Sequence, residues 1–187
     1  MHNSNRMRAA IAAIGAAALV CAAALVSPAH AVSGNTTTTF TLTAGSLAIS
    51  VPASASLGSV GTGTATTSAQ LGSTQVSDGR GALLGSWTSS VSTTDFTTGG
   101  ATANETISKS QADYWSGAAT ATTGVGTFTP GELLVANKVA LGSSQTAFSA
   151  TVVVGNNTAT WNPTMIINIP AAAVAGTYTG TVTHSVA

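Results

Sequence analysis

The sequence has very few charged residues, with five basic and five acidic side chains among 187 residues. Beyond residue 31, three basic residues accompany the five acids, which gives a formal net charge of −2. A protein that binds nucleic acid or anionic lipid needs a basic face, so the composition excludes both classes of partner. The surface must consist of Thr, Ser, Asn, Gln and Gly, which gives little electrostatic protection against association between strand edges.

Cysteine and histidine are also scarce. Cys21 is the only cysteine, so residues 32–187 can hold no disulfide, no thiolate metal ligand and no thiol nucleophile. His184 is the only histidine after residue 31, the acids lack the Asp-x-Asp spacing of a calcium loop, and the chain has no nucleophile-elbow motif. We therefore expect no metal, no cofactor and no enzymatic activity.

The N-terminus has the pattern of a secretory signal peptide over residues 1–31. Two arginines precede an uncharged apolar run at residues 9–26, and the cleavage-site triplet Ala29-His30-Ala31 follows. An uncleaved anchor is the alternative, because the run is near the lower length limit for spanning a bilayer. Export without disulfides is typical of bacterial proteins. We expect one domain at residues 32–187, secreted and extracellular or associated with the cell wall.

The first half of this domain shows short runs with the period of two that marks half-buried strands. Phe40 and Leu42 alternate with threonines, and after Ala44-Gly45 the alternation resumes at Leu47 and Ile49, which predicts a first hairpin. Small residues dominate residues 53–73, where we expect short strands and loops.

The stretch at residues 75–96 holds an acid and a base two positions apart, a glycine-bounded turn and a strand with Trp87. After it we expect a loop, a weaker strand at residues 106–114 and another loop at residues 117–126. Residues 132–136 fit a buried strand or a short helix equally well.

The last third is the most regular part of the chain. Phe148, Ala150, Val152 and Val154 share one face, residues 155–157 form a turn, and Trp161, Met165, Ile167 and Ile169 share another face. This pattern predicts two facing strands, followed by a terminal strand with Tyr178, Val182, His184 and Val186 on one face.

The fold class follows from these short alternating runs, the abundance of Thr and the Gly-rich turns. No long segment after residue 31 has the 3.6-residue period of a helix, so we predict an all-β, antiparallel, immunoglobulin-like β-sandwich. The corner at Pro170 followed by Tyr178 is analogous to the tyrosine corner of immunoglobulin-like domains, in which a tyrosine hydroxyl fastens a crossover.

One series of motif residues can be compared with a known family: Val76-Ser77-Asp78-Gly79-Arg80-Gly81, then Gly85, Trp87 and Phe96. This series resembles the first half of the WxL domain. Near the C-terminus, Gly176-Thr177-Tyr178 leads into residues 181–186, and His184 stands where the second tryptophan of that family would be. The resemblance, which extends to small secreted actinobacterial proteins, implies noncovalent attachment to the cell wall and binding of peptidoglycan.

Four residues are candidates for contact with a ligand. Asp78 and Arg80 form a loop clasp or contact a wall polymer through bidentate hydrogen bonds of the arginine. Tyr114 and Trp115, which would face opposite sides of a strand, are candidates for stacking on sugars.

Four other residues are assigned to the structural motif: Gly81, Trp87, Tyr178 and His184. We expect Trp87 to fill the core between the sheets and His184 to be a hydrogen-bonded residue of the core or its rim. Asp78 and Arg80 as an exposed pair would add only about 0–1 kcal/mol of stability.

Two functions remain open. The first is a noncatalytic surface protein that associates noncovalently with the cell wall and binds peptidoglycan or another envelope polymer. The second is a structural surface protein that self-associates, or docks to a partner surface protein, through uncharged strand edges such as residues 150–155. In both cases we expect no nucleic acid partner and no stable membrane span after signal cleavage.

Overall fold

The computed structural model describes residues 33–187, so the predicted signal peptide at residues 1–31 lies outside the described residues. Residues Thr41–Ala187 form one compact unit, and residues 33–40 belong to a separate one. Residues 33–40 are exposed and contain no strand. No helix in the described part of the chain is long and apolar enough to cross a membrane.

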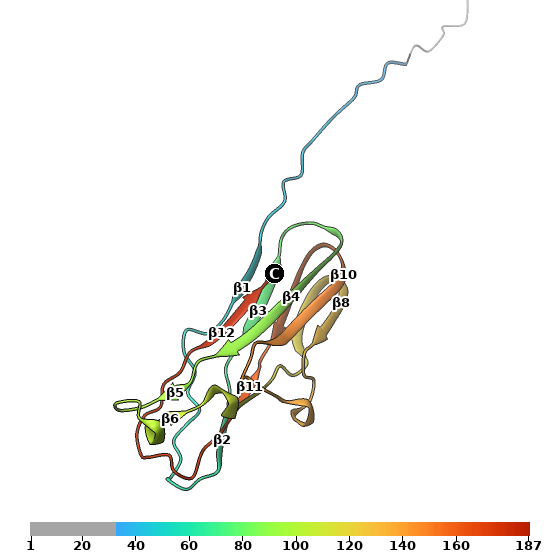
Figure 1. Cartoon of the computed structure of the whole chain (residues 1–187). Helices are drawn as coiled ribbons and strands as arrows, with labels where there is room; N and C mark the ends of the chain where they lie inside the picture. Colours follow the sequence, from blue (N-terminus) through green and yellow to red (C-terminus); the bar gives the residue numbers. More distant parts are fainter. Residues whose placement is uncertain (1–32) are drawn as a thin grey trace, which may run out of the picture. The chain divides into compact units, whose positions relative to one another are not determined.

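The larger sheet contains six strands, all of them paired antiparallel. Its order is β1-β3-β10-β4-β12, and β8 also pairs with β10 (Figure 1). These strands are β1 (Leu47–Ser50), β3 (Thr74–Asp78), β4 (Leu83–Thr93), β8 (Ala119–Pro130), β10 (Gln145–Trp161) and β12 (Val182–Val186).

A second sheet has the order β2-β11-β7-β9, and β5 and β6 form a small two-stranded sheet. Their pairs are antiparallel as well, which confirms the predicted all-β, antiparallel class. The bounds are β2 (Thr66–Gln70), β5 (Phe96–Thr97), β6 (Thr106–Ile107), β7 (Ala112–Trp115), β9 (Val139–Ala140) and β11 (Thr164–Asn168). Three short 3-10 helices connect them: η1 (Ala103–Glu105), η2 (Lys109–Gln111) and η3 (Val135–Asn137).

Strands β3 and β4 lie end to end along one long partner, β10. Asn157 to Trp161 of β10 pair with β3, whereas residues from Gln145 to Val154 pair with β4. The rings of Phe148 and Trp161, both on β10, nevertheless stack with centroids 4.8 Å apart. Thirteen residues of straight strand would separate them by about 43 Å, so β10 must fold back on itself between its two halves.

The bend of β10 has a local backbone cause. Val152 has a φ of 55° and Gly155 a φ of 69°, both in the left-handed region that a regular strand never uses. The register with β4 shifts between Ala150 and Val153. Two bulge-like irregularities therefore turn the strand, and the paired strands turn with it.

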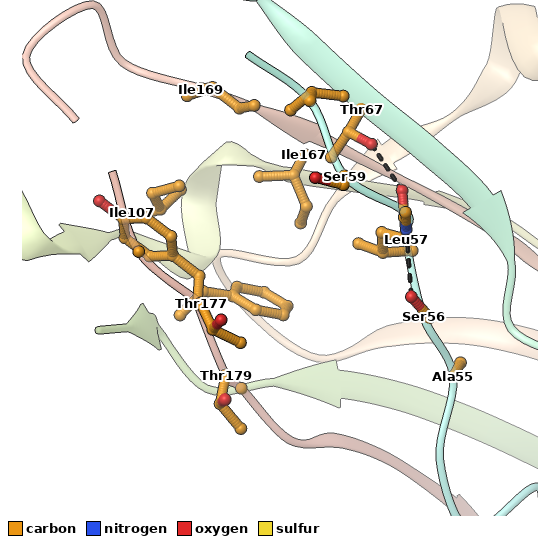
Figure 2. Close-up of a pocket in the computed structure, with 16 residues that line it drawn as sticks. Ala55, Ser56, Leu57, Ser59, Thr67, Ile107, Ile167, Ile169, Thr177 and Thr179 are labelled. Carbon is orange, nitrogen blue, oxygen red and sulfur yellow. Dashed lines mark hydrogen bonds between the residues drawn. The ribbon is translucent and has the colours of Figure 1, made fainter. Parts of the chain in front are cut away.

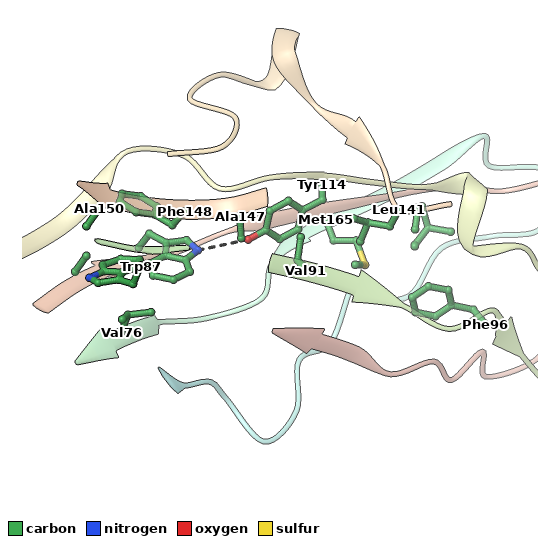
Figure 3. Packing of buried hydrophobic residues seen from close by; sticks show 14 of the residues in the cluster. Val76, Trp87, Val91, Phe96, Tyr114, Leu141, Ala147, Phe148, Ala150 and Met165 are labelled. Carbon is green, nitrogen blue, oxygen red and sulfur yellow. Dashed lines mark hydrogen bonds between the residues drawn. The ribbon is translucent and has the colours of Figure 1, made fainter. Parts of the chain in front are cut away.

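The core lies inside this bend and against the second sheet. Trp87 of β4 stacks on Phe148 with ring centroids 6.4 Å apart, and Phe148 stacks in turn on Trp161. Tyr114 of β7 and Met165 of β11 extend the same cluster from the second sheet (Figure 3). Trp87, predicted to be a core residue, is 1% exposed.

The predicted first hairpin is wrong. Residues 33–46 contain no strand, and β1 begins only at Leu47. Phe40 and Leu42 are 90% and 88% exposed, respectively. Alternation of apolar and polar residues indicates that one face of a possible strand is apolar. It does not indicate whether another part of the chain packs against that face.

Three other segments differ from the sequence prediction. The expected loop at residues 117–126 lies largely within β8, whose Thr, Ala and Gly side chains carry almost no apolar alternation. Residues 132–136 form no buried strand, because Leu133 and Leu134 are exposed. The short 3-10 helix η3 begins at Val135, so the short-helix alternative holds only at the end of this segment. Val152 leaves the face shared by Phe148 and Ala150, since the bulge reverses its direction and leaves it 57% exposed.

Candidate functional site

The Asp78-Gly79-Arg80-Gly81 segment links β3 to β4 and forms a closed clasp. The Arg80 Nε donates to Asp78 Oδ1 at 2.9 Å, and Arg80 Nη2 donates to Oδ2 at 2.9 Å. The backbone N–H of Arg80 donates to Oδ1 at 3.0 Å, and Nη2 also donates to the carbonyl of Ser86 at 2.8 Å. Gly81 follows with a φ of 65°, a conformation that glycine adopts without strain.

Asp78 is buried, contrary to the expectation of an exposed pair. Its carboxylate is 1% exposed while Arg80 is 36% exposed. The hydrogen bonds from Arg80 lower the pKa of Asp78 below its ordinary value of 3.8 and more than offset burial, which raises it. A buried carboxylate without its partner is costly, so removing Arg80 should destabilise the fold by more than the 0–1 kcal/mol expected for an exposed pair.

Asn157 connects the clasp to the core, and the sequence reasoning missed it. Its Oδ1 accepts a hydrogen bond of 2.9 Å from Trp87 Nε1, and its Nδ2 donates to Asp78 Oδ2 at 3.4 Å. Asn157 is 2% exposed. The only sequence signal was its place in an Asn pair after Gly155, which suggested a turn rather than a buried link between two strands.

The structure brings a second group of predicted residues together around Tyr114. Its hydroxyl lies 3.2 Å from His184 Nε2 and accepts from Trp161 Nε1 at 3.4 Å. Burial lowers the pKa of His184 to about 4 and raises that of Tyr114 above its ordinary value. Neutral His184 can accept a hydrogen bond from the Tyr114 hydroxyl. Because the pKa of His184 falls from 6.5 to about 4 on folding, the stability of the fold decreases as pH drops from about 6.5 to about 4.

Tyr114 is therefore not a ligand-binding residue, because its side chain is 0% exposed. Trp115, on the opposite side of the same strand as predicted, is only half-buried. The two rings lie on the two faces of β7 and cannot form one stacking surface. Tyr114 therefore offers no exposed ring on which a sugar could stack.

Tyr178 lies apart from both groups and fastens the crossover before β12. Its hydroxyl is 3.0 Å from the carbonyl of Val174, four residues upstream, and 3.1 Å from that of Asn104. It precedes β12, whose inner face carries Val182, His184 and Val186 as predicted.

Glu132 is a buried acid that the sequence reasoning did not single out. It is 6% exposed, its Oε2 has no hydrogen-bond partner among the described residues, and burial raises its pKa to about 7. Its folded state favours the protonated acid, so stability falls as pH rises from about 4.5 to about 7. No group of three or more potential metal ligands occurs in residues 33–187.

Two adjoining cavities open beside the region where β12 approaches the second sheet. They measure about 520 Å³ and about 210 Å³ and share Ala55, Leu57, Phe96 and Gly180 in their walls. The larger one has Leu57 on one side and Ile107 on the other, with Ile167 between them (Figure 2). Together they form one groove with walls of mixed polar and apolar character, which we call the β12 groove.

The outer face of the larger sheet is covered with hydroxyl groups. Thr123 and Thr158 lie 2.7 Å apart between their Oγ1 atoms, Gln75 donates to Thr160 Oγ1 at 2.9 Å, and Ser90 and Ser185 are joined at 2.8 Å. These residues occupy the register positions that point away from Trp87, Ala159 and Trp161. We call this array, which also includes Ser77, Thr88, Thr127, Thr129, Ser149 and Thr151, the hydroxyl face.

The fold and these sites define an all-β protein of antiparallel sheets with a neutral, hydroxyl-covered face. No protein-family model matches the chain, and no similar curated protein or solved structure was found. The resemblance to the WxL domain therefore rests on the motif residues alone.

Proposed function

We propose that this chain is a noncatalytic, secreted surface protein that associates noncovalently with the cell wall by binding peptidoglycan or another envelope polymer. The observation that carries the proposal is the hydroxyl face, which offers many hydrogen-bond donors and acceptors and no charge. Glycan strands present hydroxyl and amide groups of the same kind. An extended array of such groups suits a polymer that repeats along its length better than a compact small ligand.

The hydroxyl face replaces the Tyr114 and Trp115 pair as the contact surface. Thr158 and Ser77 are paired across β10 and β3, and Thr123 pairs with Thr158 from β8. Three neighbouring strands thus contribute to one row of hydroxyl groups. Asp78 follows Ser77 along β3 but points to the buried face of the sheet. The hydrogen bonds of Asp78 and Arg80 are used within the clasp, which favours a structural role for the pair.

We also propose that the fold is an immunoglobulin-like sandwich related to WxL domains. An immunoglobulin-like sandwich is supported by the bond between the hydroxyl of Tyr178 and the carbonyl of Val174, which has the form of a tyrosine corner. A relationship to WxL domains is supported by the clasp at residues 78–81 followed by the core residue Trp87.

Sedimentation with purified sacculi tests the proposed function. The triple variant Ser77→Ala, Thr123→Ala and Thr158→Ala should raise the dissociation constant by roughly a hundredfold, because three lost hydrogen bonds at about 1 kcal/mol each sum to about 3 kcal/mol. A matched control removes three exposed hydroxyls outside the strands, at Thr62, Ser73 and Ser144, and should bind like the unmodified protein. Equal binding by both variants, or no sedimentation of the unmodified protein, would reject the proposal.

Self-association is a second candidate function, favoured by one observation. Strand β8 pairs only with β10 among the described residues, so its other edge is unpaired along Ala119–Pro130. This edge carries no charged residue, whereas edge strands commonly use charge to prevent pairing with other molecules. Oligomers whose size increases with protein concentration would be expected, whether or not sacculi are present.

A further inference from the structure

The β12 groove has the dimensions of a binding site for a small molecule. Its larger cavity measures about 520 Å³, which lies within the range of about 300–1,000 Å³ that is usual for ligand pockets. The smaller cavity, of about 210 Å³, adjoins it. Because the two cavities share part of their walls, one elongated molecule can extend from one cavity into the other.

The side chains of the groove walls carry no formal charge. None of the described residues that line either cavity is Asp, Glu, Lys or Arg. His184 lines the smaller cavity and is neutral above about pH 4, because burial lowers its pKa to about that value. An ionised group placed in the groove would lose its water without meeting an opposite charge, which is costly. The groove therefore favours an uncharged ligand.

The larger cavity offers aliphatic side chains to the apolar part of such a ligand. Leu57 lies on one side, Ile107 on the other and Ile167 between them (Figure 2). Val60 and Ile169 add to the same lining. Contact between aliphatic groups is favourable without any particular direction, so this cavity suits a flexible alkyl chain.

One wall of the groove is built from residues 51–60, whose backbone has few internal partners. The segment contains no strand, and no backbone-to-backbone hydrogen bond joins it to the rest of the described chain. The Thr67 hydroxyl donates to the carbonyl of Leu57 at 2.7 Å and provides one attachment. Most N–H and C=O groups of this wall thus remain available to the polar atoms of a ligand.

The smaller cavity contains a polar side chain whose hydrogen-bonding capacity is unused. Thr74 lines this cavity, is 1% exposed, and has no hydrogen-bond partner for its Oγ1 among the described residues. A buried hydroxyl without a partner is costly. Rotation about χ1 exchanges the places of the hydroxyl and the methyl group, so Thr74 can turn Oγ1 toward the cavity without breaking a hydrogen bond.

His184 offers a second polar group, and a relay of hydrogen bonds determines which ring nitrogen carries the proton. Trp161 Nε1 donates to the Tyr114 hydroxyl at 3.4 Å, and that hydroxyl lies 3.2 Å from His184 Nε2. Tyr114 therefore donates onward to Nε2. A neutral imidazole has a single N–H, so the proton lies on Nδ1, which can donate to an oxygen atom in the smaller cavity.

We propose that the β12 groove binds an uncharged amphiphile, with its alkyl chain in the larger cavity and an oxygen-bearing head between Thr74 and His184 in the smaller one. Monoacylglycerols and other fatty esters of polyols belong to this class. Their ester and hydroxyl oxygens can accept from the Nδ1–H of His184 and pair with Thr74 Oγ1. The groove shares no residue with the hydroxyl face, so this site is independent of the proposed wall binding.

Calorimetric titration with 1-octanoylglycerol, below the concentration at which it forms micelles, tests the class of ligand. Binding should be saturable, with one molecule per chain. The shorter 1-butanoylglycerol should bind at least about tenfold more weakly, because four fewer methylene groups are buried. Octanoate, with a charged head, should also bind at least about tenfold more weakly. Equal affinity for either comparison compound, or no saturable binding of 1-octanoylglycerol, would overturn the proposal.

Two tryptophan variants test the place of binding. Ala55 lies in the wall that both cavities share, so Ala55→Trp should fill the groove and abolish binding of 1-octanoylglycerol. Ala136→Trp, at an exposed position outside both cavities, should bind like the unmodified protein. Both alanines are exposed, so neither variant should change the urea unfolding midpoint. Binding that survives Ala55→Trp, or that is lost equally in both variants, would contradict the proposal.

The variant Thr74→Val tests the position of the head. Valine has nearly the shape of threonine but no hydroxyl, so the unbound variant should be at least as stable in urea as the unmodified protein. Its affinity for 1-octanoylglycerol should fall about three- to tenfold. An unchanged affinity would mean that the hydroxyl has no contact with the ligand and would overturn this placement of the head.

The hydroxyl-face variant separates this site from the proposed wall binding. The Ser77→Ala, Thr123→Ala, Thr158→Ala protein should bind 1-octanoylglycerol like the unmodified protein, whatever its affinity for sacculi. Conversely, Ala55→Trp should still sediment with sacculi. Loss of 1-octanoylglycerol binding in the hydroxyl-face variant would contradict a separate site in the β12 groove.

Discussion

At the scale of single residues, a network of hydrogen bonds couples the surface to the core through Asp78. Arg80 holds the carboxylate from the solvent side, and Asn157 links it to the indole of Trp87. The sequence indicated the ion pair and the buried tryptophan separately. It could not indicate that Asn157, far along the chain, joins them, because that contact depends on the register between β3 and β10.

Replacing Asp78 by asparagine should destabilise the protein in a pH-dependent way. The folded-state pKa of Asp78 is lowered, so its contribution to stability is present above its ordinary pKa of 3.8 and is lost as pH falls through the folded value. We expect Asp78→Asn to lower the free energy of unfolding by about 1–3 kcal/mol near neutral pH. Urea unfolding at about pH 7 and about pH 3 measures this difference, which should shrink at the lower pH.

Asp95→Asn is the matched control for that measurement. Asp95 is exposed and accepts a hydrogen bond from the backbone N–H of Lys109 through Oδ1, which an asparagine Oδ1 can also accept. Its unfolding free energy should change little at either pH. The role of the clasp would be contradicted if the unmodified protein and Asp78→Asn had equal free energies of unfolding at neutral pH. It would also be contradicted if their difference did not shrink at about pH 3.

At the scale of elements, the bend in β10 organises the fold. It brings Phe148 and Trp161 into contact and creates the enclosed side of the larger sheet. The bend also depends on close approach between strands. A Cβ on Gly126 of β8 would lie 2.6 Å from a methyl group of Val153, so only glycine allows β8 to follow β10 past the bulge.

The predictability of the elements differs for a physical reason. Strands with apolar alternation, such as β1, β11 and β12, could be predicted because one face packs against the core. Strand β8 could not, since most of its side chains are exposed and its sequence reads as a loop. The segment around Phe40 and Leu42 was predicted as part of a hairpin because its alternation is real, although no strand of residues 33–187 pairs with it.

The candidate sites show the same limit. Asp78 and Arg80 are neighbours in sequence, so their pairing could be predicted. The burial of Tyr114 and the existence of the hydroxyl face could not, because both depend on which strands lie side by side. Alternation alone identifies two faces of a strand, but the topology decides whether the less apolar face also becomes covered.

The strained residue at the bend gives a prediction at this scale. Val152 holds a left-handed φ of 55° and is 57% exposed, so its side chain stabilises little and its backbone costs about 1–2 kcal/mol. Val152→Gly should raise the free energy of unfolding by about 0.5–1.5 kcal/mol.

The neighbouring Thr151 is the control for the bend. It is exposed in the same strand and is not among the positive-φ residues, so Thr151→Gly should lower the free energy of unfolding by about 0.5–1 kcal/mol. Thermal and urea unfolding of both variants measure the two changes. A loss of stability in Val152→Gly equal to that in Thr151→Gly would mean that the left-handed backbone carries no strain.

At the scale of the whole molecule, the scarcity of charge determines which partners fit. The described residues present a neutral sheet face rich in hydroxyls, a groove of mixed polar and apolar character and the unpaired edge of β8. Each of these surfaces suits contacts made by hydrogen bonds or apolar burial. None of them carries the charge needed to attract a charged polymer over a distance. Such an attraction would weaken with added salt, because salt screens charges.

The salt dependence of binding to purified sacculi tests the central proposal most directly. Contacts through neutral hydroxyl groups should give dissociation constants that agree within about twofold between about 0.05 M and 0.5 M sodium chloride, because screening acts only on charges. The Ser77→Ala, Thr123→Ala, Thr158→Ala variant should bind more weakly at both concentrations. Binding that disappears at high salt, or that is unaffected by loss of these hydroxyls, would contradict the assignment of the hydroxyl face as the wall-binding surface.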